Sequence, residues 1–472
     1  MDWASDWAGL RALTTRPQYL EQAVEVADKW LAYQQYFLRV PSVSVGIFYD
    51  DRILFKKGYG YANLESEKPA SPGTCYRIAS ISKLFTATAI MQLLDDGKVQ
   101  LDDPVAEYLD QFRRMKGEAR KITIRHLLTH LSGMTRDGNT SHWVDSRFPS
   151  REDIRKQFGG ETLYYPPLKR FKYSNFAYGL LGNVIESVTG KGDGSYRDYV
   201  NGNIIKRIHL TRTTVDFEPS FRTRMATGYS RLLPGRRRKA LAHVTTGALA
   251  PATGFTSNVE DLCKFLMAHM HGGKPLITEL SEREMQHPYW MSEDGSRGRG
   301  IGFGIVKVGD RTVIGHSGGF LGFSTIAAMD VKAKLGVVVL TNATDGPALA
   351  LMSGVFHVFR HFELNVTGLR PRKNRRLGKY EGAFSGDWGD LEVVALGSEL
   401  FALDLTQQRP FDMALKLSHL RGDEFKIELG DEFDYIGERA RFQFDSKGKV
   451  SKVQIGPNPV PAVPDGKLWK RK

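Results

Sequence analysis

The sequence predicts an α+β fold in which one antiparallel sheet is flanked by helices in a layered sandwich, followed by a small all-β, barrel-like domain. Three observations predict it. Strand patterns occur near both ends of the first 368 residues, helical patterns lie between them, and beyond Leu377 the pattern changes to short alternating strands. We therefore expect one domain at 1–368 and a second at 377–472, joined by a basic linker at 369–376.

The first elements are a helix and a hairpin. Apolar residues recur at helical spacing between Leu20 and Leu31, which predicts an amphipathic helix over 17–38. Apolar residues then alternate over 43–49, and after an Asp-Asp turn the chain returns over 53–55. This pattern predicts a β-hairpin.

The next helix, from Ser80 to Asp95, is apolar nearly all round, so we expect it to be buried and closed by Gly97. A capping-box spacing at Ser257 and Glu260 predicts a later helix start. The remaining expected elements are helices at 124–132, 176–188 and 351–362 and strands at 312–314, 324–329 and 336–340. Six short strands are expected in the second domain, at 391–395, 400–405, 413–417, 425–429, 439–444 and 450–455.

Composition narrows the class of protein. The chain has 472 residues, is 41% hydrophobic and 25% charged, and has two cysteines, which excludes a disulfide framework and is typical of a globular protein. A net charge of +13 admits nucleic acid as a partner, but the basic runs lie in loop-like sequence, so we expect solvated loops and no nucleic-acid partner.

The N-terminus lacks the pattern of a secretory signal, and no stretch is long enough to span a membrane. We expect a cytoplasmic protein, or a periplasmic or secreted one if a leader has been removed.

Ser80 and Lys83 form an S-x-x-K pair at the start of the buried helix. Positions i and i+3 lie on one helix face, so the hydroxyl and the amine are neighbours. A hydroxyl needs a base to become a nucleophile, and a buried lysine amine has a lowered pKa. The helix start also offers the Ser80 N–H to a developing oxyanion. Ser82 is the rival hydroxyl, but it points about 100° away from Lys83 on a helix.

Two further clusters carry polar groups suited to the same chemistry. Tyr173 and Asn175 stand just before a helix, where a neighbouring ammonium is expected to depress the tyrosine pKa and the amide can hold Lys83 or a substrate amide. His316, Gly318 and Gly319 follow a predicted strand. The glycines permit a close backbone approach, so this strand edge can pair with a peptide-like substrate and offer the Gly319 N–H as a second oxyanion donor.

These three motifs, in this order, resemble the serine β-lactamase and penicillin-binding-protein superfamily, in particular its class C and DD-peptidase-like branch. The matching stretches span most of residues 30–365 and lie at 77–83, 97–105, 124–133, 173–175 and 316–318. The resemblance implies a β-lactamase/DD-peptidase-like sandwich and a lipocalin-like C-terminal domain that restricts access to the site. It also implies a Ser80 acyl-enzyme and no cofactor.

The resemblance assigns the site residues as well. Lys83 and Tyr173 would be the acid/base pair, and which of them takes the proton stays open. Asn175, His316, Gly318 and Gly319 would bind substrate. A metal at His126 and His130, which have the i, i+4 spacing of a metal pair, is not expected, because no third ligand is evident.

His316 departs from the lysine that β-lactamases of this branch carry, and a neutral histidine binds a carboxylate more weakly. We therefore expect a peptidase or amidase, DD-peptidase- or D-aminopeptidase-like, on a small-molecule or short-peptide substrate. A carboxylesterase using the same site is the alternative, followed by a weak β-lactamase and a catalytically silent binding protein. A homo-oligomer is left open.

Overall fold

The computed structural model describes residues 19–115, 117–157, 163–190, 195–366, 376–386, 389–397, 399–429 and 435–463. Contacts group the chain into two compact units: Arg39–Met352, here the sandwich unit, and Met1–Leu38 with Ser353–Lys472, here the barrel unit. Each unit has its own sheet and its own apolar core. The predicted linker lies outside the described residues except for Arg376, and the domain boundaries given above stay a prediction.

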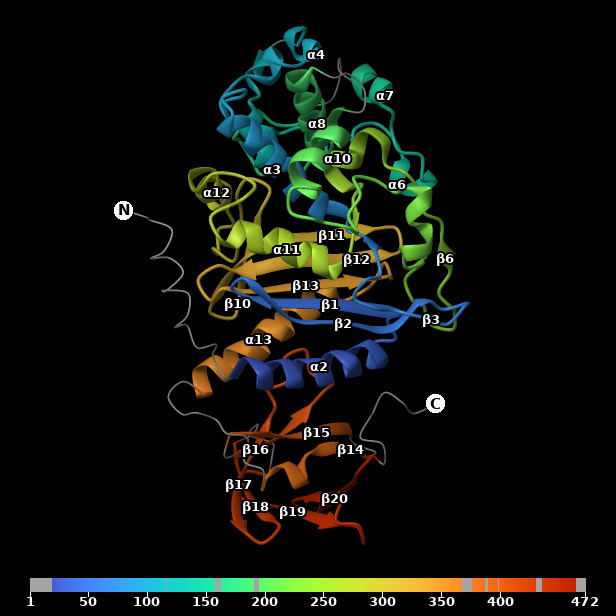
Figure 1. The fold of residues 1–472 in the computed structure, drawn as a ribbon, viewed down its shortest axis with the longest axis vertical. Helices are drawn as coiled ribbons and strands as arrows, with labels where there is room; N and C mark the ends of the chain where they lie inside the picture. The colour runs from blue at the N-terminus through green and yellow to red at the C-terminus, as the bar shows by residue number, and fades with distance from the viewer. Residues whose placement is uncertain are drawn as a thin grey trace, which may run out of the picture. The chain divides into compact units, whose positions relative to one another are not determined.

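The sandwich unit contains a nine-stranded antiparallel sheet with the order β3-β2-β1-β13-β12-β11-β10-β9-β8 (Figure 1). Its central strands come from opposite ends of the unit, since Val43 of β1 faces Thr341 of β13. The predicted sheet built from both ends is thereby confirmed. Its strands are β1 (Ser42–Tyr49), β2 (Arg52–Asn63), β3 (Lys68–Pro69), β8 (Trp290–Met291), β9 (Arg297–Arg299), β10 (Gly304–Val308), β11 (Arg311–Phe320), β12 (Phe323–Asp330) and β13 (Leu335–Thr341).

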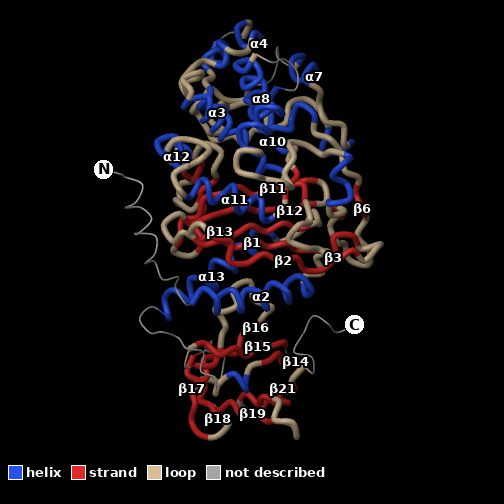
Figure 2. The backbone as a smooth tube through the Cα atoms, in the orientation of Figure 1, coloured by secondary structure: helices blue, strands red, loops and turns tan. Residues whose placement is uncertain are grey.

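Helices cover the sheet in two groups. Helix α11 packs on β1, β12 and β13, whereas α3, α8 and α10 pack on one another on the β11 side of the sheet (Figure 2). The α-helices of the chain within the described residues are α2 (Tyr19–Phe37), α3 (Ser82–Asp95), α4 (Asp110–Arg113), α5 (Ile124–Leu128), α6 (His142–Asp145), α7 (Arg151–Lys156), α8 (Asn175–Thr189), α9 (Ser195–Val200), α10 (Ala250–Thr253), α11 (Val259–Met270), α12 (Glu279–Gln286) and α13 (Ala348–Val366). None of them is long and apolar enough to cross a membrane.

Helix α3 confirms the predicted buried helix. Its residues from Ser82 to Leu93 are all buried, and Gly97 follows in the left-handed conformation at φ 70°. The predicted start of α11 is wrong by one residue, because Asn258 caps the helix through the backbone N–H of Asp261.

The barrel unit confirms the predicted small all-β fold. Eight antiparallel strands follow one another in chain order, and the N–H of Val463 donates to the carbonyl of Ala383, which brings the last strand beside the first. The interior holds aromatic rings, including Tyr380, Phe425 and Phe442. The strands are β14 (Gly382–Gly386), β15 (Gly389–Leu396), β16 (Glu399–Asp404), β17 (Leu415–Arg421), β18 (Glu424–Leu429), β19 (Arg439–Phe444), β20 (Val450–Ile455) and β21 (Asn458–Pro461).

Helix α2 belongs to the barrel unit through specific contacts. The Lys29 ammonium pairs with Glu392 at 2.6 Å, and the Tyr33 hydroxyl donates to Asp390 at 2.8 Å. The buried Gln34 amide donates to the carbonyl of Leu405 at 2.6 Å. The first helix of the described residues is thus tied to positions more than 350 residues away.

Candidate active site

Ser80 lies in a short 3-10 helix, Ala79–Ile81, between the strand β4 (Tyr76–Arg77) and α3. Ala79 has a φ of 50°, a conformation that costs energy for a residue with a Cβ. The rival hydroxyl of Ser82 is fully buried, where it donates to the Ala79 carbonyl at 2.5 Å and accepts from the Phe255 N–H at 3.0 Å. The partly exposed Ser80 hydroxyl is therefore the one available for chemistry.

Lys83 is fully buried, with its amine 3.2 Å from the Ser80 hydroxyl oxygen. Two other acceptors surround it, the Asn175 side-chain oxygen and the Ala252 carbonyl, each at 2.7 Å. Burial lowers the pKa of Lys83 well below its ordinary value. A neutral amine has two N–H bonds for these two acceptors and one lone pair left for the Ser80 proton. The arrangement suits a general base.

Tyr173 also contacts the nucleophile, because its hydroxyl donates to the Ser80 oxygen at 2.8 Å. The expected lowering of its pKa is wrong: burial raises the pKa of Tyr173 to about 12, although the hydrogen bond with Ser80 and the nearby Arg299 act in the opposite direction. Burial outweighs the effect of the neighbouring cations on this phenol. Tyr173 is therefore a protonated donor at neutral pH.

Asn175 connects Lys83 to a carboxylate that the sequence did not reveal. Its amide nitrogen donates to Asp137 at 2.6 Å, which turns its oxygen toward Lys83. Although burial opposes ionisation of Asp137, the neighbouring His142, Asn175 and Trp143 side chains keep its pKa below the ordinary range. Asp137 lies in a loop without a recognisable motif. Only its contact with Asn175 identifies it.

Strand β11 presents a free edge beside Ser80. Its pairing with β10 ends at Gly315 opposite Gly304, whereas its pairing with β12 continues to Phe320. Residues in an antiparallel ladder alternate between bonding the partner strand and turning away from it. The pair Phe320–Phe323 closes the hairpin, so Gly319 turns its N–H away from β12 toward the free edge. That N–H suits the expected role of oxyanion donor.

Gly318 has a steric role. A Cβ at this position would lie 2.2 Å from the Ile78 carbonyl oxygen and 2.4 Å from the Thr325 hydroxyl, whereas a Cβ at Gly319 meets nothing within 4 Å. The strand can approach the residues that precede Ser80 because no side chain stands between them.

We expect Gly318→Ala to lower the free energy of unfolding by about 1–3 kcal/mol and to impair turnover, because Ile78 must move and Ser80 moves with it. Urea unfolding followed by circular dichroism measures the first effect. The matched control is Gly319→Ala, which should change the free energy of unfolding by less than about 0.5 kcal/mol. Equal destabilisation by the two substitutions would contradict this packing argument.

His316 lies at the start of the free edge, with its ring 6.1 Å from that of Tyr173. Its Nδ1 lies 2.6 Å from the Ser317 carbonyl oxygen, so this nitrogen carries the proton, and burial lowers the pKa of His316 well below its ordinary value. The ring is therefore uncharged at neutral pH. A positive charge that faces a ligand beside His316 must therefore come from another residue.

The two histidines at metal-pair spacing have separate structural contacts. His126 Nδ1 accepts from the Thr123 N–H at 3.1 Å, and the buried His130 Nδ1 accepts from the Ser174 N–H at 3.1 Å. The His130 ring also packs 4.3 Å from that of Tyr173. Within the described residues, no group of three or more His, Cys, Asp or Glu could hold a metal ion.

Arg299 is the positive residue that sequence reasoning missed. The sheet register places it opposite Gly304, which in turn faces Gly315, the residue before His316. Burial is the main cause of the lowered pKa of His316 and of Lys83, and the charge of Arg299 lowers both further. Among the described residues its guanidinium has no carboxylate partner and lies over the Phe171 ring at 5.6 Å.

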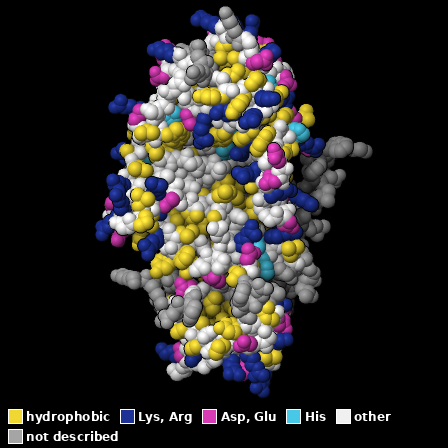
Figure 3. Space-filling view, turned by 180° about the vertical axis from the view of Figure 1, so that it is seen from behind, with side chains coloured by type: hydrophobic (Ala, Val, Ile, Leu, Met, Phe, Trp, Pro, Cys, Tyr) yellow, Lys and Arg dark blue, Asp and Glu magenta, His cyan; other side chains and the backbone are white. Residues whose placement is uncertain are grey.

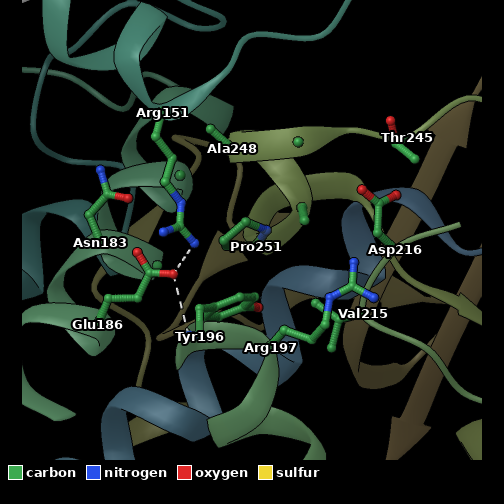
Figure 4. Close-up of a pocket in the computed structure, with 14 residues that line it drawn as sticks. Arg151, Asn183, Glu186, Tyr196, Arg197, Val215, Asp216, Thr245, Ala248 and Pro251 are labelled. Carbon is green, nitrogen blue, oxygen red and sulfur yellow. Dashed lines mark hydrogen bonds and ion pairs between the residues drawn. The ribbon is translucent and has the colours of Figure 1, made fainter. Parts of the chain in front are cut away.

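A separate cavity of about 240 Å³ lies behind α10 (Figure 4). Arg151 and Glu186 face each other across it as an ion pair, and Arg197 at its edge pairs with Glu218 at 2.7 Å. Helix α10 separates this cavity from Lys83, to which it offers the Ala252 carbonyl. The charged residues of its lining all have ion-pair partners, and Ser80, Lys83 and Tyr173 are not among the lining residues.

Basic side chains do not form a single patch on the visible surface. On the face drawn in Figure 3, Lys and Arg are interspersed with Asp and Glu. In the run 236–239, Arg238 pairs with Asp345. The run 370–376, apart from Arg376, and the run 467–472 lie outside the described residues, and the absence of a nucleic-acid partner stays a prediction.

A serine that contacts a buried amine and a phenol, beside a free strand edge, has the groups that serine hydrolases use, here on a mixed sheet-and-helix fold. The chain belongs to the Beta-lactamase family, whose model matches residues 28–353. Protein flp of Staphylococcus aureus (strain N315) is 28% identical over 317 residues, which cover 67% of this chain and 62% of that relative.

Solved structures give the same fold. The octameric penicillin-binding protein homologue from Pyrococcus abyssi is 26% identical with a TM-score of 0.64, and the match covers 93% of this chain and 99% of that chain. A D-stereospecific amidohydrolase from Streptomyces sp. is 26% identical with a TM-score of 0.57, covering 67% and 94%. The resemblance found in the sequence and the serine-hydrolase class are confirmed.

Proposed function

We propose that this protein hydrolyses an amide bond of a short peptide through a Ser80 acyl-enzyme, and that the leaving amino acid carries a free carboxylate. One observation carries this proposal: Arg299, which has no carboxylate partner among the described residues, lies beside the free edge of β11 and the Ser80–Lys83–Tyr173 cluster. A free strand edge binds extended peptides through main-chain hydrogen bonds. A guanidinium binds a carboxylate with two parallel hydrogen bonds. The similarity to a D-stereospecific amidohydrolase supports a substrate containing D-amino acids.

The geometry supports a two-step mechanism. Neutral Lys83 takes the Ser80 proton while the Ser80 oxygen attacks the amide carbonyl, and the N–H groups of Ser80 and Gly319 stabilise the oxyanion. Tyr173 gives its proton to the leaving nitrogen, and the C–N bond breaks. The proton that Lys83 took from Ser80 then passes to Tyr173. Water then attacks the ester by the reverse route and releases Ser80.

The two ends of the free edge of β11 differ, and this difference sets the direction in which the substrate binds. Arg299, His316 and Tyr173 lie together at the end where pairing with β10 stops. Because Tyr173 protonates the leaving nitrogen, the leaving group lies at this end. The acyl portion extends along Gly319 toward Phe320.

The test compares a peptide with a free C-terminal carboxylate, N-acetyl-D-Ala-D-Ala, with its C-terminal amide. We expect wild-type kcat/KM to favour the free acid by roughly 10- to 100-fold, since a charge-assisted hydrogen bond contributes about 1.5–3 kcal/mol. Arg299→Gln should abolish this preference, whereas Arg299→Lys should retain part of it. A wild-type enzyme that cleaves both peptides equally would sink the role of Arg299.

The carboxylesterase alternative gives a different result. Such an enzyme would hydrolyse p-nitrophenyl acetate but neither peptide.

Self-association is proposed as well, because the octameric homologue covers 93% of this chain. Light scattering coupled to size-exclusion chromatography would give the mass, and a value near the 53.0 kDa of one chain would contradict it.

A further inference from the structure

Arg299 has a second guanidinium as its neighbour on β9. Arg297 and Arg299 are two residues apart on this strand, so their side chains lie on the same face of the sheet. Among the described residues, no carboxylate forms an ion pair with either of them. Burial lowers the pKa of Arg299, and the charge of Arg297 lowers it further. The two like charges repel each other, and a bound anion would relieve this repulsion.

The register of the sheet shows how the two side chains differ. Gly304 of β10 pairs with Arg299, and a Cβ on Gly304 would lie 2.1 Å from Arg299 Nη1, so this guanidinium crosses β10 toward β11. Val306, which is half-buried, pairs with the exposed Arg297 on the same face. Because Val306 has a side chain where Gly304 has none, Arg297 cannot cross β10 in the same way. Arg299 therefore points inward to the site, and Arg297 remains at its rim.

The backbone at Arg297 is held in place by the turn between β8 and β9. Its N–H donates to the Ser292 hydroxyl oxygen at 3.0 Å, and its carbonyl accepts from the Ser292 N–H at 2.7 Å. The acids of this turn do not neutralise it by direct contact. Asp294 accepts from the hydroxyls of Ser292 and Ser296, and neither Asp294 nor Glu293 forms an ion pair with Arg297 in the described part of the chain. The Arg297 guanidinium is available to a ligand.

The spacing of the two cations fits a dicarboxylate. Two residues of a strand span about 6.8 Å, at about 3.4 Å each. The two carboxylates of glutamate are separated by three carbon atoms, and the flexible arginine side chains can cover the remaining difference. Val306, beside Arg297, offers an apolar contact to the methylene groups of such a ligand.

We infer that the leaving group of the substrate is an acidic amino acid, whose α-carboxylate binds to Arg299 and whose side-chain carboxylate binds to Arg297. This inference rests on the proposed function, since it requires a leaving amino acid with its α-carboxylate at Arg299. It narrows the class of substrate to acylated amino acids of glutamate length that carry two negative charges.

Two other cations near Tyr173 are less suited to the second carboxylate. Arg136 lies over the Tyr173 ring at 5.3 Å, but it pairs with Asp137 at 3.2 Å. Lys172 lies over the Tyr164 ring at 4.8 Å. Both therefore have contacts within the chain, and the experiment distinguishes them from Arg297.

The experiment uses the full chain and two peptides with the same α-carboxylate, N-acetyl-D-Ala-D-Glu and N-acetyl-D-Ala-D-Gln. We expect wild-type kcat/KM to favour the glutamate peptide about 5-fold, near the upper limit for exposed charge pairs, and this preference should shrink as salt is added. Arg297→Gln should bring the ratio close to 1, and Arg297→Glu should reverse it. Because the ratio compares two substrates on one preparation, incomplete folding of a variant does not change it.

The matched control is Arg52→Gln, which removes an 81% exposed arginine of β2, on the far side of the same sheet, and should leave the ratio unchanged. A preference that survives Arg297→Gln, or that is lost in Arg136→Gln or Lys172→Gln instead, would overturn the assignment to Arg297. Wild-type cleavage of both peptides at equal rates would overturn the second carboxylate and leave the proposed function standing. Cleavage of N-acetyl-D-Ala-D-Ala but of neither longer side chain would do the same, whereas cleavage of none of the three peptides would overturn the proposed function as well.

Discussion

Ser80→Ala is expected to abolish turnover of every ester and amide substrate, with a loss of kcat/KM on the order of 10⁴-fold or more. The reason is geometric: the Ser80 oxygen lies 3.2 Å from the Lys83 amine and 2.8 Å from the Tyr173 hydroxyl, so removing it leaves both groups without a reacting atom. A fluorophosphonate probe, which reacts with activated serine hydroxyls with loss of fluoride, should add its mass to the wild type and not to Ser80→Ala.

The control for this experiment is the neighbouring hydroxyl. Ser82→Ala removes a buried side chain that holds Ala79 and Phe255, so it should destabilise the protein by about 1–3 kcal/mol. The folded fraction should nevertheless still take up the probe at Ser80. Labelling of Ser80→Ala, or loss of labelling in well-folded Ser82→Ala, would refute the assignment of the nucleophile.

The parts of this site that could be predicted from sequence are the local ones. Ser80 and Lys83 are three residues apart, and any helical geometry places them together. Arg299 could not be found in this way, because it is 216 positions from Lys83 and only the pairing of β9, β10 and β11 brings it near. Asp137 is recognised only by its hydrogen bond to Asn175.

Electrostatics were predicted less well than geometry. The expected lowering of the Tyr173 pKa relied on a neighbouring ammonium. Burial lowers the pKa of Lys83, as expected for a buried amine, but it raises that of Tyr173. Depth of burial depends on how α3, α8 and α10 pack, and a pattern of residue types does not specify it.

The fold shows the same division between local and distant information. The strands of the barrel unit with strong apolar alternation were predicted, whereas β14 and β21 were missed. Their sequences, Gly382–Gly386 and Asn458–Pro461, are rich in residues with low strand propensity, and pairing with their neighbours forms them. The attachment of α2 to the barrel unit through Lys29 and Glu392 is likewise invisible to local patterns.

Replacement of Lys83 is the second change with a large expected effect. Lys83→Arg keeps a positive charge at this position but cannot become neutral near pH 7, because a guanidinium holds its proton above about pH 12. Lys83→Met removes the amine and keeps the apolar stem. If the neutral amine takes the Ser80 proton, both variants should lose about 10²- to 10⁴-fold in kcat/KM, the usual contribution of a general base.

The pH dependence distinguishes a base from a fixed charge. The pKa of Lys83 is lowered, so kcat/KM of the wild type should rise with pH as Lys83 loses its proton, and should not fall before Tyr173 ionises near pH 12. His130 and His316 also have lowered pKa values and lose protons as the pH rises, so the wild-type profile alone does not identify the group. In Lys83→Met the part of the rise that belongs to Lys83 should disappear from the residual activity. An unchanged profile in Lys83→Met, or near-normal activity in Lys83→Arg, would show that this position supplies charge and that the proton from Ser80 goes elsewhere.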